Sequence, residues 1–83
     1  MNDPIQARRL SNDIRVILIR WERGYAVVAQ QYMPHCNYYW EVGLDGWRDT
    51  VFSPAATLEG ARREFENRVR QEERYLEARR KAV

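Results

Sequence analysis

The sequence predicts an α+β fold in which a three- to four-stranded antiparallel sheet, made of two hairpins, packs against one long C-terminal helix. Two observations predict the sheet: β-branched and aromatic residues are dense over residues 14–52, and turn-forming residues interrupt them. A third predicts the helix, because apolar residues recur at helical spacing from Leu58 to about Ala82. With 83 residues, the chain has room for a single domain, 1–83.

The first 12 residues fit either a short helix or a frayed terminus. Asp3 and Pro4 suit the N-cap and the first position of a helix. A helix this short has little stability without tertiary contacts, because its nucleation is costly. The sequence leaves both alternatives open.

Residues 14–32 predict the first hairpin. Residues 14–21 carry apolar side chains on both faces, which is typical of a central strand. Residues 22–24 predict a three-residue loop with Gly24 in the left-handed conformation, so that Trp21 faces Tyr25. In this register one sheet face contains Ile17, Ile19 and Val27, and the other contains Val16, Leu18, Ala26 and Val28.

Residues 38–52 predict the second hairpin. The dipeptide Asp45-Gly46 lies between two runs rich in aromatic residues, 38–44 and 47–52, and this is a strong hairpin signal. The pairing gathers large side chains on one face, which is either core or interface: Tyr38, Trp40, Val42, Leu44, Trp47 and Val51.

The helix is predicted over residues 54–82, with Ser53-Pro54 leading into it and Thr57 as a second candidate N-cap. Its apolar stripe consists of Leu58, Ala61, Phe65, Val69, Leu76 and Val83. A helix of about 25 residues is about 37 Å long, whereas strands of seven or eight residues span about 25 Å. We therefore expect its last two to three turns to extend past the sheet.

The charges of the helix largely balance one another. From Thr57 onward there are eight basic and six acidic residues, and the formal net charge of the whole chain is +2. Three pairs have the stabilising i,i+4 spacing with the acid first: Glu59 with Arg63, Glu66 with Arg70, and Glu77 with Lys81. Three arginines near the end are the least neutralised: Arg74, Arg79 and Arg80.

The residue types exclude the common reactive sites. The chain has one histidine, His35, and one cysteine, Cys36, which is too few for a zinc site or a supported Cys-His nucleophile. The four glycines form no phosphate-binding cluster. We predict that the protein is not an enzyme, with no catalytic, cofactor-binding or metal-binding residues.

The sequence also predicts a cytoplasmic protein. A single cysteine cannot form an internal disulfide, and no leader is recognisable before the first predicted strand. The longest apolar stretch, residues 16–19, is far shorter than the roughly 20 residues that span a bilayer. We expect an intracellular, unprocessed chain without a membrane span.

Aromatic residues and arginines are the candidate partner-binding residues. Such aromatic side chains stack on bases in single-strand binders, and Trp, Tyr and Arg also dominate the binding energy of protein interfaces. The candidates are Tyr38, Tyr39, Trp40, Trp47, Arg48, Arg70, Arg74, Arg79 and Arg80. Alternatively, the aromatic residues pack in the core, and the arginines form ion pairs on the solvent-exposed surface of the helix.

The first hairpin offers apolar residues to both sheet faces, whereas one helix covers one face. The second face therefore needs a cover. The N-terminal residues could supply part of it, and a second copy of the chain, forming a homodimer, or a foreign protein could supply more.

Parts of the sequence resemble known families. Residues 34–66 resemble a double-stranded-RNA-binding domain in Pro34-His35, Tyr39, Asp45-Gly46 and Ser53, but Ala55, Ala56, Leu58 and Glu59 replace the lysines of that family. Residues 24–27 with Pro34, and residues 57–61, resemble pieces of HicB-type antitoxins. The order of strands and helix is similar to that of AP2-type DNA-binding domains. What these families share is layout, which does not determine function.

In size and surplus aromatic surface the chain also resembles small phage-encoded inhibitors, anti-CRISPR proteins among them. This resemblance implies a protein that acts by occupying a surface. The leading hypothesis is a non-enzymatic binding protein that covers a site on another protein or on a nucleoprotein complex. The alternative is a DNA- or RNA-binding regulator that contacts phosphates through the sheet or the arginine-rich helix.

Overall fold

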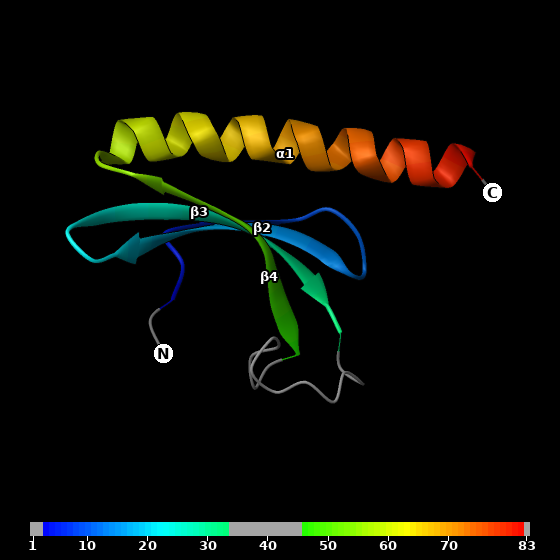
Figure 1. The fold of residues 1–83 in the computed structure, drawn as a ribbon, viewed down its shortest axis with the longest axis horizontal. Coiled ribbons are helices and arrows are strands. Elements are labelled where there is room, and N and C mark those ends of the chain that lie inside the picture. Colours follow the sequence, from blue (N-terminus) through cyan, green and yellow to red (C-terminus); the bar gives the residue numbers. More distant parts are fainter. Residues whose placement is uncertain (1–2, 34–45, 83) are drawn as a thin grey trace.

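The computed structural model describes residues 3–33 and 46–82. Four antiparallel strands lie in the order β1-β2-β3-β4, and the helix α1 lies across one face of their sheet (Figure 1). The bounds are β1 (Gln6–Arg9), β2 (Ile14–Trp21), β3 (Gly24–Tyr32), β4 (Trp47–Ala55) and α1 (Leu58–Lys81). The predicted α+β class, the four-stranded antiparallel sheet and the long C-terminal helix are confirmed.

The N-terminal segment forms strand β1, which is neither the short helix nor the frayed terminus that the sequence left open. Its register with β2 runs from Gln6 opposite Leu18 to Arg9 opposite Arg15. The Ile5 N–H adds a hydrogen bond of 2.8 Å to the Leu18 carbonyl. Pairing satisfies main-chain groups that a short helix would leave without partners, and this outweighs the capping signals at Asp3 and Pro4. The predicted strand 38–44 lies outside the described residues.

The β2–β3 hairpin differs from the prediction by one residue. Trp21 lies opposite Gly24, so Glu22 and Arg23 alone form the turn, and Glu22 adopts the left-handed conformation with φ 52°. Gly24 belongs to the strand, where a Cβ would lie 2.7 Å from the Ala55 carbonyl oxygen. A shift of one residue in a sheet exchanges faces. Ala26 and Val28 therefore share a face with Ile17 and Ile19 rather than with Leu18.

Strand β4 continues through Pro54 to Ala55, so the helix begins later than residue 54. Pro54 fits because β4 is the last strand in the described sheet, and an edge strand can lose a donor. Thr57 is the N-cap, and its Oγ1 accepts a hydrogen bond of 3.0 Å from the Gly60 N–H. The second predicted cap is thus the one that the chain uses.

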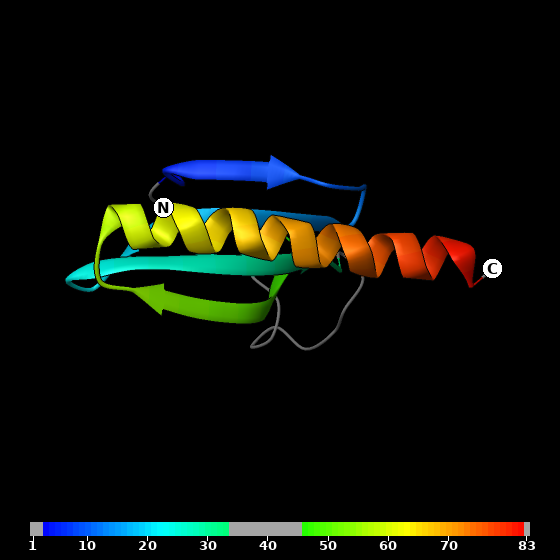
Figure 2. The same ribbon diagram turned by 90° about the horizontal axis from the view of Figure 1, so that it is seen from above.

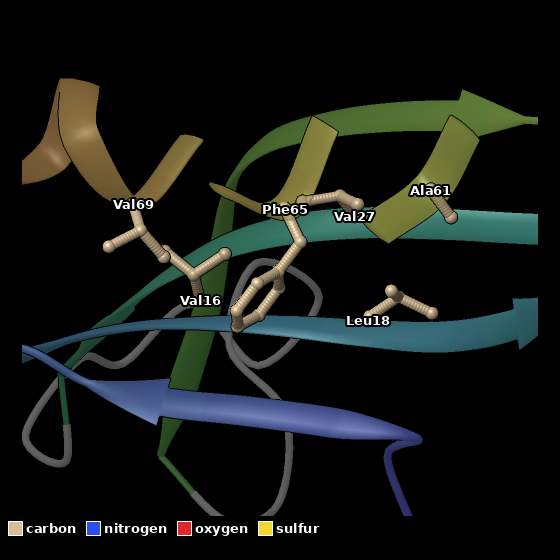
Figure 3. Packing of buried hydrophobic residues seen from close by; sticks show 6 residues of the cluster. All are labelled: Val16, Leu18, Val27, Ala61, Phe65 and Val69. Atoms are coloured by element: carbon tan, nitrogen blue, oxygen red, sulfur yellow. The ribbon is translucent and has the colours of Figure 1, made fainter. Parts of the chain in front are cut away.

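The core lies between the sheet and the first half of α1 (Figure 3). Val16, Leu18 and Val27 face the helix, which contributes Ala61, Phe65 and Val69. These three helix residues belong to the predicted stripe, and beyond Val69 no described helix residue is buried. The C-terminal end of α1 extends past the strands, as expected (Figure 1). Within the described ranges, no helix is long and apolar enough to cross a membrane.

Candidate binding surface

The corrected register defines the sheet face that points away from α1. Opposite residues in antiparallel strands share a face, so Ile17, Val28 and Phe52 lie together, and Ile19, Ala26 and Pro54 follow them. Ile17, Ala26 and Val28 form a buried cluster separate from the core beneath α1. We call this surface the second sheet face. Its described members are Ala7, Arg9, Arg15, Ile17, Ile19, Trp21, Gly24, Ala26, Val28, Gln30, Tyr32, Trp47, Asp49, Phe52 and Pro54.

Large apolar side chains are exposed on the second sheet face. Within residues 3–33 and 46–82, five such side chains are exposed: Ile5 at 40%, Trp21 at 39%, Tyr32 at 38%, Phe52 at 43% and Tyr75 at 52%. Three of the five, Trp21, Tyr32 and Phe52, lie on this face, Ile5 precedes β1, and Tyr75 lies on α1. Single exposed apolar residues are normal, whereas several on one face mark an interaction surface.

The apolar half of the face is built around Trp21 and Phe52. The two rings meet edge to face, with centroids 5.0 Å apart and an interplanar angle of 75°. Trp21 comes from β2 and Phe52 from β4, on either side of β3. The small side chain of Ala26, which lies midway between their levels on β3, leaves room for the rings and is itself fully buried. The result is a pair of contacting aromatic side chains, each partly exposed.

The other half of the face combines an aromatic ring with cations. The Arg15 guanidinium carbon lies 4.1 Å from the Trp47 ring centroid, and that of Arg9 lies 5.6 Å away. The Tyr32 ring is 5.1 Å from the Trp47 ring. These cation–π contacts hold both guanidinium groups over the Trp47 ring.

Arg15 also begins a polar chain across three strands. Its Nε donates to Gln30 Oε1 at 2.6 Å, and Gln30 Nε2 donates to Asp49 Oδ1 at 2.7 Å. A register shift between Ala29 and Gln30 brings Asp49 into line with Gln30, and Thr50 Oγ1 donates to the Ala29 carbonyl at 3.0 Å. The bulge therefore supplies the acceptor at the end of this chain.

The charges on α1 follow the predicted pairing in part. Glu59 and Arg63 are 3.8 Å apart, and Glu77 and Lys81 are 3.6 Å apart, which confirms two pairs. The third pair was wrong, because Glu66 reaches Arg8 on β1 at 3.5 Å and Arg70 instead donates to Asn67. A tertiary contact to the sheet has replaced a local one within the helix.

An ion pair connects the C-terminal end of α1 to the turn between β1 and β2. Both terminal nitrogens of Arg79 donate to the Asp13 carboxylate, at 3.3 and 3.4 Å, and Ser11 Oγ donates to the same carboxylate at 2.8 Å. The hydrogen bond from Arg79, followed by that from Ser11, lowers the pKa of Asp13. In turn the hydrogen bond to Asp13 raises the pKa of Arg79. Arg79 was expected to be poorly neutralised, and this contact was not visible from spacing.

The structure separates the predicted site residues. Trp47 lies on the second sheet face, whereas Arg48, one residue later, lies on the opposite face of the sheet. The four predicted helix arginines are Arg70, Arg74, Arg79 and Arg80, and α1 packs on that opposite side. Arg80 pairs with Glu77, while Arg74 makes no ion pair with any described residue. Trp47 and the helix arginines therefore belong to different surfaces.

Several predictions fall outside the described residues: Tyr38, Tyr39, Trp40, His35 and Cys36. The residues that sequence reasoning missed are Trp21, Tyr32 and Phe52. Their signal was strand alternation, which assigns them to one face once the registers of β2, β3 and β4 are known. Among the described residues, no cluster of three His, Cys, Asp or Glu side chains could hold a metal ion.

No protein-family model, curated protein or solved structure matches the chain. Inference about function therefore starts from the surfaces described above.

Proposed function

We propose that this chain is a small, non-enzymatic binding protein that acts by occupying a surface of a larger macromolecular assembly through its second sheet face. The observation that carries the proposal is the exposure of Trp21 and Phe52, at 39% and 43%, on the same face as Tyr32. Burying such side chains against a partner would remove apolar area that folding leaves in water.

The composition of the face supports a protein partner. Interface energy is concentrated in Trp, Tyr and Arg, with apolar anchors surrounded by polar groups. The Trp21–Phe52 pair would supply the anchor, and Arg15 with Gln30 and Asp49 would supply hydrogen-bonding groups at its border. Because the rings already contact each other, little side-chain entropy is lost when they bind.

The size of the face favours a partner that also contacts neighbouring elements. Four strands at about 4.8 Å spacing and about eight residues at 3.3 Å give a flat area of roughly 500 Å². A stable interface buries about 800 Å² per partner. A homodimer through this flat face alone would fall short of that, so we favour a larger surface that extends around the sheet edges.

Affinity capture with matched surface variants tests the proposal. Phe52→Lys places a charge on the second sheet face, and Tyr75→Lys makes the same change on α1, at the other exposed aromatic residue. We expect the wild-type chain and Tyr75→Lys to retain the same protein from a lysate, and Phe52→Lys to lose it. Light scattering of each variant alone separates a homodimer from a foreign partner.

The opposite pattern would refute the proposal. Equal retention by Phe52→Lys and wild type would show that the second sheet face is not used. A dimer in solution that Phe52→Lys dissociates would mean that a second copy is the occupant. Circular dichroism establishes that both variants are folded.

A second candidate is binding to single-stranded DNA or RNA. The exposed Tyr32 ring favours it, since it lies beside Arg15 and Arg9, which contact the buried Trp47 ring, and aromatic rings with adjacent cations bind bases and phosphates. The expected sign is an affinity for oligothymidylate that falls as salt rises, since neutralised phosphates release counterions. No binding at low salt would eliminate this candidate.

A further inference from the structure

A pocket lies at the end of the sheet where β2 turns into β3 and where β4 leads into α1. Its volume is about 350 Å³. The ends of β2 and β3 form one side with Trp21 and Gly24, and the end of β4 forms the other with Pro54, Ala55 and Ala56. Figure 1 and Figure 2 show the β2–β3 turn and the link from β4 to α1 at the same end of the molecule, opposite the C-terminus. The pocket is therefore built from two segments that are far apart in the sequence.

Three small residues and two rings set the shape of this pocket. Its two sides meet at Gly24, where a Cβ would lie 2.7 Å from the Ala55 carbonyl oxygen. Gly24, Ala55 and Ala56 are too small to fill the pocket with their own side chains. The large walls are Trp21, whose ring is positioned by its edge-to-face contact on the second sheet face, and Pro54, whose ring fixes its φ angle. The fold thus forms the pocket before a ligand binds, which lowers the entropy cost of binding.

The pocket is continuous with the second sheet face. Trp21 and Pro54 line the pocket and also belong to that face, and both are exposed. One wall of the pocket is therefore the same Trp21 ring that forms half of the exposed aromatic pair. A protein that lies on the second sheet face reaches the pocket without leaving this ring.

The charges around the pocket favour an uncharged ligand. Its charged lining residues are Glu22 and Arg23, which have opposite formal charges. A further cation already lies over a lining ring, because the Arg20 guanidinium carbon is 5.9 Å from the Tyr25 ring centroid. A cationic ligand would therefore meet two arginines and one carboxylate. An anionic ligand would lose hydration against walls that are mostly apolar or aromatic.

We propose that this pocket receives one large apolar side chain, of the size of Leu or Phe, from the protein that covers the second sheet face, an inference that rests on the function proposed for that face. The volume is near the lower end of the range for small-ligand sites, so it suits one side chain rather than a strand or helix. An apolar group that displaces weakly held water gains affinity. Side chains that fill such pockets supply much of the binding energy of protein interfaces.

Nuclear magnetic resonance with defined probes tests the pocket in the absence of the partner. The probes are the N-acetyl amides of Leu, Phe, Lys and Glu, each titrated into the isotope-labelled chain. We expect the Leu and Phe probes alone to shift the main-chain amide signals of Gly24 and Ala56, with saturation in the millimolar range. The amide signal of Tyr75, on the exposed part of α1, should not move.

A variant that fills the pocket tests the assignment of these shifts. Ala56→Leu adds a side chain at an exposed position of the lining and should abolish the shift at Gly24. Ala78→Leu makes the same change at an exposed position of α1 and should bind the probes like wild type. With a partner captured by the wild-type chain, Ala56→Leu should weaken the complex about tenfold, and Ala78→Leu should leave its affinity unchanged. Circular dichroism establishes that both variants are folded.

The inference fails if the Leu and Phe probes leave Gly24 and Ala56 unshifted, if all four probes act alike, or if Ala56→Leu keeps the shifts. The captured partner separates this inference from the function proposed for the second sheet face. A partner that Phe52→Lys loses but Ala56→Leu binds at full affinity would refute the role of the pocket alone. A partner that both variants bind at full affinity would refute the function proposed for the face as well.

Discussion

The Trp21 and Phe52 rings meet edge to face across the central strand β3, with their centroids 5.0 Å apart. They come from strands that are not neighbours in the sheet, and the small Ala26 between them makes the contact possible. The pair thus joins β2 to β4 on the face without a helix. It links the two strands, and both rings remain partly exposed.

A double-mutant cycle on this pair should detect the contact. Trp21→Leu and Phe52→Leu each remove one ring and keep an apolar side chain. Edge-to-face pairs contribute about 0.5–1.5 kcal/mol beyond area burial, so the two losses should be less than additive by about that amount. Urea unfolding of the four proteins measures it. Simple additivity would mean that the rings do not interact in solution.

Phe65 should be the most sensitive helix residue. This residue of α1 is fully buried against Val16, Leu18 and Val27 of the sheet (Figure 3). Phe65→Ala leaves a cavity and should lower the free energy of unfolding by about 3–5 kcal/mol. Tyr75→Ala, on the exposed part of the same helix, should change it by less than about 0.5 kcal/mol. Thermal or urea unfolding followed by circular dichroism gives both values.

Gly24→Ala should destabilise the hairpin although Gly24 is not in the turn. The added Cβ would lie 2.7 Å from the Ala55 carbonyl oxygen, so β3 and β4 must move apart. We expect a loss of about 1–3 kcal/mol in the free energy of unfolding. Arg23→Ala, at the exposed neighbouring position, is the control and should have little effect. An unchanged stability of Gly24→Ala would contradict the close approach of the strands.

The contact between Asp13 and Arg79 predicts a pH dependence. The folded-state pKa of Asp13 is lowered from 3.8, so its ionised form favours folding. The stabilisation from ionised Asp13 is therefore fully present at pH values above the unfolded-state pKa of 3.8. It is lost as the pH falls through the lowered folded-state pKa. Asp13→Asn should melt at a slightly lower temperature than wild type at neutral pH, and the difference should shrink in acid. A difference that grows in acid would contradict the assignment.

Local signals in the sequence predicted the order and type of most elements. The apolar stripe of α1 identified Ala61, Phe65 and Val69, and Thr57 was recognised as a cap because its side chain satisfies a main-chain N–H. The dense β-branched run at Ile14 predicted a strand with two apolar faces. These features depend on neighbours within a few residues, which the sequence displays directly.

Long-range contacts determined the rest. Nothing near Gly24 in the sequence reveals that Ala55 approaches it, and that approach keeps Gly24 in the strand and fixes the hairpin register. Gln6–Arg9 becomes a strand because β2 has a free edge, although its own residues do not alternate clearly. Asp13 and Arg79 are separated by 66 positions, so helix spacing could not pair them. Because register decides faces, this one-residue error placed Val27, instead of Ala26 and Val28, on the face that contains Ile17 and Ile19.

Photo-crosslinking in cells tests most directly whether the second sheet face is the site of action. A benzophenone amino acid replaces Phe52 in one protein and Tyr75 in another, so that each probe takes the place of an exposed aromatic residue on a different surface. The account predicts a covalent adduct with a larger protein from position 52 and none from position 75. An adduct from position 75 alone, an adduct from position 52 with a second copy of this chain, or none from either would contradict it.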